Sequence, residues 1–289
     1  LDAGSDTGVS NTDRITSDTT PTFTGTTEPG ATVRLYGTDQ TTVLNTATAD
    51  PVTGHWSLTS SVLPAGTHTF TVKAMDMLGN ISAPSSGLIV IIDTEMPDAP
   101  SSLAMVAMSD TGASNTDAIT RVTTPIIKGM AEAGSVVTLY DTDGTTVLGT
   151  TVASGSGNWS ITSSSLAEGA HTLTTRAKDV AGNTSAASKG LVVTIDNYVD
   201  MPSAPDLDDA SDSGISSMDD ITNVTTPTFT GMAEANSWVT LYDTDGATVL
   251  GMALADGRGF WSITSSTLAE GTHAMSVKVV DVAGNVSAA

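Results

Sequence analysis

Apolar and polar residues alternate along this chain in short segments. Phe70, Val72 and Ala74, for example, are separated by Thr71 and Lys73. Because successive side chains of a strand point to opposite faces, this period of two predicts strands with one buried and one solvated face. Turn-forming pairs such as PG, DG and GN interrupt the pattern about every ten residues, and no segment has a helical period. The pattern therefore predicts an all-β fold.

The same order of segments occurs three times. Trp56, Trp159 and Trp261 lie about 100 residues apart, and their alternation with neighbouring aliphatic residues places each in a core. Around each lie a loop such as SDTGASNTD, then TTP, VTLYD, the Trp strand and a GN turn. This period is that of an immunoglobulin-like sandwich of about seven strands. We expect three tandem immunoglobulin-like (Ig-like) β-sandwich domains in an elongated rod, over residues 1–96, 97–200 and 201–289.

Two proline-containing segments, TEMPDAP and NYVDMPSAP, join the predicted repeats, which favours stiff and extended connections. Repeats 1 and 2 end in GLIVIID and GLVVTID, whereas the sequence of repeat 3 ends at NVSAA. We interpret the chain as a fragment of a longer protein. We expect the strand edge at residues 275–280 to be covered either by further residues or by a strand of a neighbouring molecule.

The charge of the chain is strongly negative. It has 32 acidic and 10 basic residues, a net charge of −22, and no cysteine. This balance disfavours nucleic acid and anionic membrane surfaces and favours metal cations. Without cysteine there is no disulfide or thiolate site, and a bound metal is the usual alternative for stabilising a small secreted β domain. No apolar run is long enough to predict a membrane-spanning segment.

Acidic residues recur in two loops of each repeat and at the end of the last strand. In an end-to-end array, the loop before the last strand lies at the N-terminal pole of its repeat, where the terminal aspartate of the preceding repeat arrives. The SDTG loop precedes the first predicted strand, so we expect it at the same pole. Crowded carboxylates repel one another unless a hard cation holds them, and Ca²⁺ takes about six to eight oxygen ligands. Gly8, Gly112 and Gly214 would let the loop wrap an ion.

We therefore predict calcium sites built from these loops and strand ends. The predicted ligands are Asp6, Asp13, Asp76, Asn80 and Asp93 in repeat 1, Asp110, Asp117, Asp179, Asn183 and Asp196 in repeat 2, and Asp212, Asp219, Asp281 and Asn285 in repeat 3. Asp93 joins the repeat 2 residues at junction 1/2, and Asp196 joins the repeat 3 residues at junction 2/3. The alternative is that these residues are ordinary turn formers. Recurrence of both loops favours calcium, although the spacing is not that of an EF-hand.

Two other polar features have simpler explanations. The YDTDG turn contains Asp141 and Asp143 in repeat 2 and Asp243 and Asp245 in repeat 3, but a DG hairpin turn explains it without a metal. Three histidines occupy equivalent positions about one domain length apart, too far for a shared zinc site. We expect each of them, His68, His171 and His273, to pack or hydrogen-bond locally.

Trp238 differs from the other tryptophans because it lies on the strand face opposite Val239 and Leu241, and it should be partly exposed. An exposed Trp can stack on a sugar or a partner surface, although a single exposed aromatic is usually incidental. No Ser, His and Asp grouping has a nucleophile-elbow context, and no glycine loop is suited to phosphate. We expect no enzymatic activity.

The ordered set SDTGASNTD, TTP, VTLYDTDG, GNWSITSSSLAEGAHTLTTRAKDVAGN and LVVTID resembles the bacterial Ig-like repeats of giant, type I-secreted, non-fimbrial adhesins. The similarity covers all three repeats. It implies a calcium-stiffened rod on the bacterial cell surface that contributes to virulence by attaching to a host-cell receptor or glycan. Repeat 2 departs from the pattern, because Val106 stands where repeats 1 and 3 have Asp2 and Asp208.

The expected partners are the adjacent repeats of the same chain and a host-cell surface receptor or glycan, with no nucleic acid and no membrane insertion, for a protein that is a monomer. Two alternative functions remain open. One is a module that itself binds a glycan or protein receptor, through Trp238. The other is a spacer of a secreted hydrolase whose catalytic domain lies outside this sequence.

Overall fold

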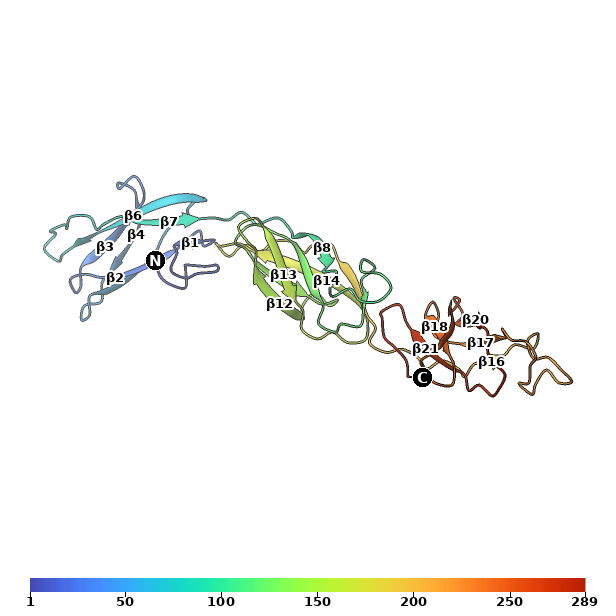
Figure 1. Ribbon diagram of the computed structural model, residues 1–289. Coiled ribbons are helices and arrows are strands. Elements are labelled where there is room, and N and C mark those ends of the chain that lie inside the picture. Colours follow the sequence, from blue (N-terminus) through green and yellow to red (C-terminus); the bar gives the residue numbers. More distant parts are fainter. Residues whose placement is uncertain (289) are drawn as a thin grey trace. The chain divides into compact units, whose positions relative to one another are not determined.

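The computed structural model describes residues 1–288 (Figure 1). These residues form strands, turns and loops, and no helix is found among them. Accordingly, the described part of the chain has no helix that could cross a membrane. The prediction of an all-β fold is confirmed, while the elongated arrangement of the repeats stays a prediction.

The chain divides into two compact units. The first comprises Leu1–Leu103, Lys128–Ile161 and Thr174–Lys189, and the second comprises Ala104–Ile127, Thr162–Leu173 and Gly190–Ala289. Repeat 2 thus contributes strands to both units. Junction 1/2 lies within the first unit and junction 2/3 within the second.

Repeat 1 is a sandwich of two sheets in the first unit. Its strands are β1 (Ile15–Thr16), β2 (Thr22–Thr26), β3 (Thr32–Tyr36), β4 (Val43–Thr48), β5 (His55–Thr59), β6 (Gly66–Met75) and β7 (Leu88–Ile92). One sheet has the order β1-β7-β6-β3-β4, and β2 pairs with β5 in the other. Inward side chains such as Phe23, Leu35 and Val90 form the core between them. Burying each contributes about 1.5–3 kcal/mol.

Repeat 2 has the same two-sheet arrangement with one more strand. Its strands are β8 (Ser101–Met105), β9 (Ile119–Thr120), β10 (Ile126–Met130), β11 (Val136–Tyr140), β12 (Val147–Val152), β13 (Asn158–Thr162), β14 (Gly169–Lys178) and β15 (Leu191–Ile195). The sheet orders are β12-β11-β14-β15-β9 and β13-β10-β8. The C-terminal half of β14 pairs with β11 in the first unit, and its N-terminal half pairs with β15 in the second.

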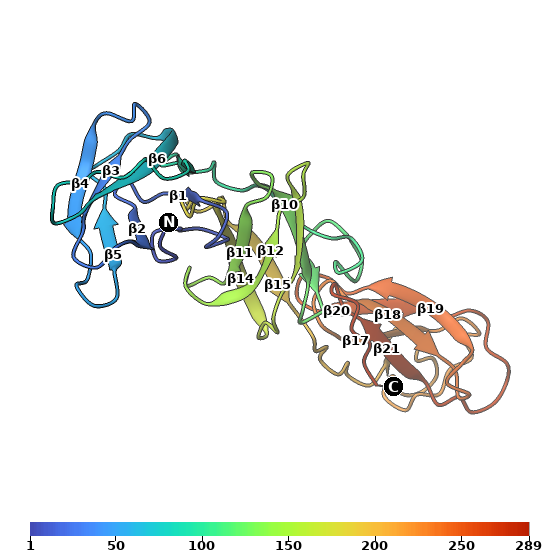
Figure 2. The same ribbon diagram turned by 90° about the vertical axis from the view of Figure 1, so that its left-hand side faces the viewer.

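Repeat 3 lies in the second unit, and Figure 2 shows its two sheets. Its strands are β16 (Asp206–Leu207), β17 (Thr228–Met232), β18 (Trp238–Tyr242), β19 (Val249–Leu254), β20 (Phe260–Thr264) and β21 (Ser276–Val280). The sheet orders are β16-β17-β20 and β19-β18-β21. Trp261, Val239 and Val277 belong to its core. In the described residues β18 is the one strand that pairs with β21, and our expectation that further residues or a neighbouring molecule cover its other edge stays a prediction.

The SDTG loop lies at the opposite pole from the one we expected. A short strand that the periodicity did not reveal precedes this loop, as β8 in repeat 2 and β16 in repeat 3, where it pairs antiparallel with β17. It carries the chain along the sandwich before the loop begins. The residues after the loop, β1 and β9, then pair in parallel with β7 and β15 of the same repeat.

The end of the SDTG loop therefore lies beside the terminal aspartate of its own repeat. The backbone N–H of Asp93 donates to Thr16 O, and that of Asp196 donates to Thr120 O, each at 2.9 Å. The sequence did not show this because only one of the five residues of β8 and one of the two residues of β16 are buried, so neither strand has a clear alternation.

Candidate metal centres at the repeat junctions

The loop that follows β6, β14 and β21 has the same local structure in all three repeats. It begins at an aspartate and ends at an asparagine. The Asp carboxylate accepts from the Asn backbone N–H at 2.8 to 2.9 Å. The Asn side-chain amide donates to the other oxygen of the same carboxylate at 2.7 to 2.9 Å. These pairs are Asp76 with Asn80, Asp179 with Asn183, and Asp281 with Asn285. We call this the DxxGN loop.

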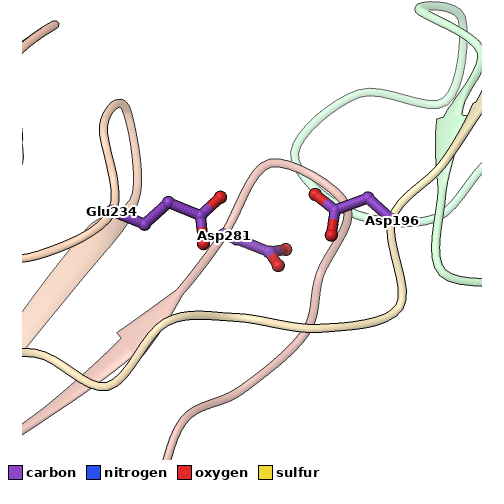
Figure 3. Close-up of side chains that lie close together, drawn as sticks. All are labelled: Asp196, Glu234 and Asp281. Atoms are coloured by element: carbon purple, nitrogen blue, oxygen red, sulfur yellow. The ribbon is translucent and has the colours of Figure 1, made fainter. Parts of the chain in front are cut away.

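At junction 2/3 the DxxGN loop meets the end of repeat 2. Asn285 Nδ2 donates to the backbone oxygen of Asp196 at 2.8 Å and to Asp281 Oδ2 at 2.7 Å. Glu234, from the turn between β17 and β18, completes the group, and one carboxylate oxygen of each acidic residue lies within 4.8 Å of the others (Figure 3). Asp281 is only 2% exposed.

The electrostatics of this cluster are unfavourable for three free carboxylates. Burial, followed by the charges of Asp281, Asp196 and Asp200, raises the pKa of Glu234. Burial, followed by the charges of Asp281 and Glu168, raises the pKa of Asp196. Glu234 and Asp196 therefore bind a proton more readily than they would in water, and a cation at the same place would relieve the same repulsion. Carboxylate and carbonyl oxygens at this separation are suited to a hard cation such as Ca²⁺.

Junction 1/2 has the corresponding residues. Asn183 Nδ2 donates to the backbone oxygen of Asp93 and to Asp179 Oδ2, both at 2.9 Å. Asp93, Asp179 and Glu132 line a cavity of about 240 Å³ together with the linker acids Glu95 and Asp98. Burial and then the charges of Asp179 and Asp93 raise the pKa of Glu132.

The DxxGN loop of repeat 1 has no such environment in the described chain. Asp76 is partly exposed and Asn80 is exposed. The hydrogen bond from the Asn80 side chain is the main cause that lowers the pKa of Asp76. This contrast shows that the loop alone does not crowd carboxylates; the preceding repeat does.

The SDTG loops carry a second, separate set of carboxylates. The first Asp of each loop is buried, and one of its oxygens has no hydrogen-bond partner in the described residues. The other oxygen accepts from a backbone N–H seven or eight residues further on. These residues are Asp6, Asp110 and Asp212. Burial, and to a lesser extent the neighbouring Asp117, raises the pKa of Asp110.

The SDTG loops of repeats 1 and 2 each contact backbone oxygens of the DxxGN loop of the next repeat. Thr7 Oγ1 donates to Ala181 O at 2.7 Å, and Thr111 Oγ1 donates to Ala283 O at 2.8 Å. Our expectation that Asp110 and Asp117 join Asp93 at junction 1/2, and that Asp212 and Asp219 join Asp196 at junction 2/3, is therefore wrong. The loop of repeat 1, with Asp6 and Asp13, lies at junction 1/2, and the loop of repeat 2 lies at junction 2/3.

The glycine of the SDTG loop is required for a different reason from the one we expected. Gly8 and Gly112 have φ of 108° and 102°. A Cβ on either would lie 2.0 Å from a carbonyl oxygen of the next repeat, that of Val180 or Val282. Close backbone approach between repeats, rather than ion wrapping, requires these two glycines. Gly214, which meets no following repeat in this chain, would have nothing within 4 Å of a Cβ.

Glu132 and Glu234 are the site residues that our sequence reasoning missed. The signal was present, because an acidic residue recurs in the same turn of all three repeats, as TEPG, AEAG and AEAN. Glu28, the repeat 1 counterpart, is exposed.

The YDTDG turns use their carboxylates locally. Asp143 accepts from the backbone N–H and the hydroxyl of Thr146, and Asp245 does the same with Thr248. The hydroxyl of Thr248 is the main cause that lowers the pKa of Asp245 to about 2. This supports a turn-stabilising role for these carboxylates.

The predicted local role of the three histidines is confirmed. Each Nε2 donates to the carbonyl four residues earlier, at 2.8 to 3.0 Å. His273 also contacts Asp243 through Nδ1 at 2.8 Å. That contact is the main cause that raises the pKa of His273.

The tryptophans fall into the two groups that were predicted. Trp159 and Trp261 are buried and Trp56 is partly buried, whereas Trp238 is 46% exposed.

The fold and the junctions define a protein of tandem Ig-like sandwiches whose loops meet the next repeat. The chain belongs to the bacterial Ig-like domain family, whose profile matches residues 1–94, 97–197 and 199–289.

Among curated proteins, the chain is similar to a chitinase and an exoglucanase. It is 36% identical over 152 residues to chitinase A1 of Niallia circulans, which covers 50% of this chain and 20% of that protein. It is 32% identical over 250 residues to exoglucanase B of Cellulomonas fimi, which covers 81% of this chain and 20% of that protein. The match spans about a fifth of the length of each relative.

Two solved structures with similar folds have low sequence identity. The fibronectin(III)-like modules of Clostridium thermocellum CbhA match with a TM-score of 0.37 and 14% identity, covering 64% of this chain and 92% of that one. A 1.5-MDa bacterial ice-binding adhesin matches with a TM-score of 0.33 and 18% identity, covering 93% of this chain and 87% of that one.

Proposed function

We propose that this chain is a calcium-stiffened segment of tandem repeats in a secreted bacterial protein, and that it extends a surface adhesin toward a host cell. The observation that carries this proposal is the origin of the three clustered carboxylates at junction 2/3. Asp196 comes from the end of repeat 2, whereas Glu234 and Asp281 come from repeat 3. An ion bound there would tie one repeat to the next, and so would restrict bending between them.

The raised pKa values of Asp196 and Glu234 support the binding of a cation at this junction rather than a purely structural role for these residues in a turn. Turn-forming aspartates have their charge stabilised by backbone N–H groups, as Asp143 has. The junction carboxylates are instead crowded by one another. Affinity in the range of extracellular modules, about 10⁻⁴–10⁻³ M or tighter, would suffice where calcium is abundant.

The direct test is isothermal titration of the full chain with CaCl₂, combined with X-ray scattering in calcium and in chelator. We expect binding with an increase in maximum dimension and a narrower distribution of distances. Glu234→Gln should weaken binding at junction 2/3, whereas Glu28→Gln, at the exposed counterpart in repeat 1, should not. Titration without heat, together with identical scattering curves, would refute the calcium proposal.

A spacer in a secreted hydrolase is the second candidate, and the similarity to chitinase A1 and exoglucanase B favours it. In that setting the same repeats would separate a catalytic domain from another module, and they would carry out no reaction themselves. The genomic reading frame around this sequence distinguishes the two. A flanking glycoside hydrolase domain would support the spacer, and a long array of further repeats would support the adhesin.

A further inference from the structure

The sheet β19-β18-β21 of repeat 3 has a more apolar outer face than the corresponding sheets of the other repeats. Figure 2 shows these three strands side by side. One outward cross-strand pair occupies the same position in every repeat, at the start of β3, β11 or β18. Its members are Thr32 and Thr48 in repeat 1, Val136 and Val152 in repeat 2, and Trp238 and Leu254 in repeat 3. The position changes from two hydroxyl groups to two large apolar side chains, while the pairing around it stays the same.

The large apolar side chains at this position are exposed. Trp238 is 46%, Leu254 52% and Met252 58% exposed. Met252 occupies the next outward position of β19, where the other repeats have Thr46 and Thr150. Trp238 lies opposite Leu254 and diagonal to Met252, so the three side chains are neighbours on one face of the sheet. We call these three residues the Trp238 surface. Adjacent large apolar side chains left in water are typical of a surface that another molecule covers.

The Trp238 surface lies over a fully paired part of the sheet, because β18 pairs with β19 on one side and with β21 on the other. In repeat 2, β15 pairs with residues 169–173 of β14, whereas Val136, the counterpart of Trp238, pairs with Lys178 at the opposite end of that strand. Val152 is 58% exposed although β15 is present. The exposure of the Trp238 surface therefore follows from its own position in the sheet.

The composition of this surface fits a protein rather than a sugar. Trp and Met are enriched in the cores of protein interfaces, and a Trp often dominates the binding energy. A sugar site needs polar groups that are free to bind hydroxyls. On this face Thr240 is buried, and the Lys278 ammonium lies over the Tyr242 ring, 5.5 Å from its centroid.

The charge of the chain favours one kind of protein surface. With 32 acidic and 10 basic residues, the chain has a net charge of −22. It attracts a partner that carries Lys and Arg around its apolar residues. A second copy of this chain brings the same negative charge and is repelled.

We propose that the Trp238 surface docks a protein that presents aliphatic side chains flanked by Lys and Arg. The indole of Trp238 packs against the aliphatic side chains of the partner, and Met252 and Leu254 exclude water around it. The negative charge of the chain steers the basic partner toward the surface. This goes beyond a stiffening role, because none of the three residues is a candidate calcium ligand. It gives repeat 3 an attachment surface that repeat 1, with threonines at the same positions, does not have.

The test uses the full chain and the synthetic, end-blocked peptide KLLKKLLKKLLK, which has leucines on one face of a helix and lysines beside them. At about 0.15 M salt, which screens long-range attraction, anisotropy of the labelled peptide should saturate below ~1 mM. The indole N–H resonance of Trp238 should shift on binding, whereas those of the buried Trp159 and Trp261 should not. Peptides with every Leu replaced by Ser, or every Lys by Glu, should bind at least ten-fold more weakly.

The matched variants exchange residues between repeats. Trp238→Thr with Leu254→Thr installs the repeat 1 pair and should weaken binding at least ten-fold. Should that variant disturb the fold, Trp238→Val with Leu254→Val installs the repeat 2 pair and should still weaken binding by a few-fold. Phe260→Asn is the control, because Phe260 is 48% exposed on a strand of the other sheet and repeat 2 has Asn158 there. This control should bind as the unchanged chain does.

Three results would overturn the proposal. The first is equal weakening by the Phe260 and Trp238 variants, which would mean that the peptide follows charge or general apolar exposure. The second is a shift of the Trp238 indole resonance with cellohexaose or chitohexaose but not with the peptide, which would identify a sugar as the occupant. The third is sedimentation of the chain as a dimer that the paired Thr substitutions convert to a monomer, which would identify a second copy.

Discussion

Repeats 2 and 3 contain corresponding segments in two different surroundings. GAHTLTTRAK forms the ten-residue strand β14, whereas in GTHAMSVKVV only the last five residues form a strand, β21. Both segments alternate in the same way, and both have their C-terminal halves paired with the neighbouring strand, β11 or β18. In repeat 3, residues 271–275 form no strand. Their counterparts in β14 are the residues that pair with β15, and no described strand of repeat 3 corresponds to β15. In both repeats the strand thus extends as far as it has a paired neighbour.

The SDTG loops give a parallel contrast. Gly112 is pressed against Val282, whereas Gly214 has open space around it. The corresponding loop thus contacts the next repeat in one copy and has no neighbour among the described residues in the other. Each prediction below compares a partnered copy of an element with an unpartnered one.

The largest effect is expected for Leu173, the buried residue of β14 that lies opposite Leu191 of β15. Leu173 is fully buried, whereas its counterpart Met275 is only partly buried and lines a cavity of about 630 Å³. Leu173→Ala should cost about 2–5 kcal/mol of unfolding free energy. Met275→Ala should cost about 1 kcal/mol, because part of that side chain already faces solvent. Denaturant titration followed by hydrogen exchange in each repeat measures both, and equal losses would show that Met275 is as deeply buried as Leu173.

The next effect concerns the junction glycines. Gly112→Ala should separate the SDTG loop of repeat 2 from residues 282–284, because the added Cβ would meet Val282 O. Gly214→Ala is the matched control, since φ is positive at both positions and both variants bear a similar backbone strain of about 1–3 kcal/mol. Only Gly112→Ala should speed hydrogen exchange in the 281–285 loop. If both variants left that loop unchanged, the contact would have no energetic role.

A smaller effect is expected from pH at junction 2/3. The pKa values of Glu234 and Asp196 are raised in the folded chain. Without calcium, the stability linked to these groups is present below their unfolded pKa and is lost as pH rises through the folded pKa. The stabilisation that calcium adds should therefore shrink as pH falls from 7 toward 4, because protons then compete for the same oxygens. Melting temperatures with and without calcium across this range provide the measurement, and Glu234→Gln should flatten the dependence.

The smallest effect concerns His273. The Asp243 contact raises its pKa, so the stability from this pair is present below pH 6.5 and is lost as pH rises through the folded pKa. Asp243→Gly, which places the repeat 1 residue at this position, should lower the His273 pKa toward its ordinary value. An NMR titration of the ring protons measures it. An unchanged pKa would mean that the contact is not maintained in solution.

Much of the fold could be predicted from the sequence. The period of about 100 residues and the alternation around Trp159 and Trp261 indicated three sandwiches, because burial of one strand face leaves a direct trace in residue order. The junction pairs, Asp93 with Asp179 and Asp196 with Asp281, were also anticipated. They depend on chain polarity, since the last strand must end at the pole where the next repeat begins.

The position of the SDTG loop could not be predicted in the same way. It depends on β8 and β16, which have one buried residue each and so little alternation, and missing them reversed the pole at which the loop lies. Glu132 and Glu234 were missed for a related reason. Each belongs to a turn far from the DxxGN loop in sequence, and only folding brings the carboxylates together.

The sequence by itself determined which residues face inward, because hydrophobic burial acts on each strand through its own period. It also determined where turns and acidic loops recur. Only the tertiary structure decided which loops meet at a junction, and which half of a strand finds a partner. Those outcomes depend on the course of the whole chain, because hydrogen-bonded edges and crowded charges arise between segments that are distant in sequence.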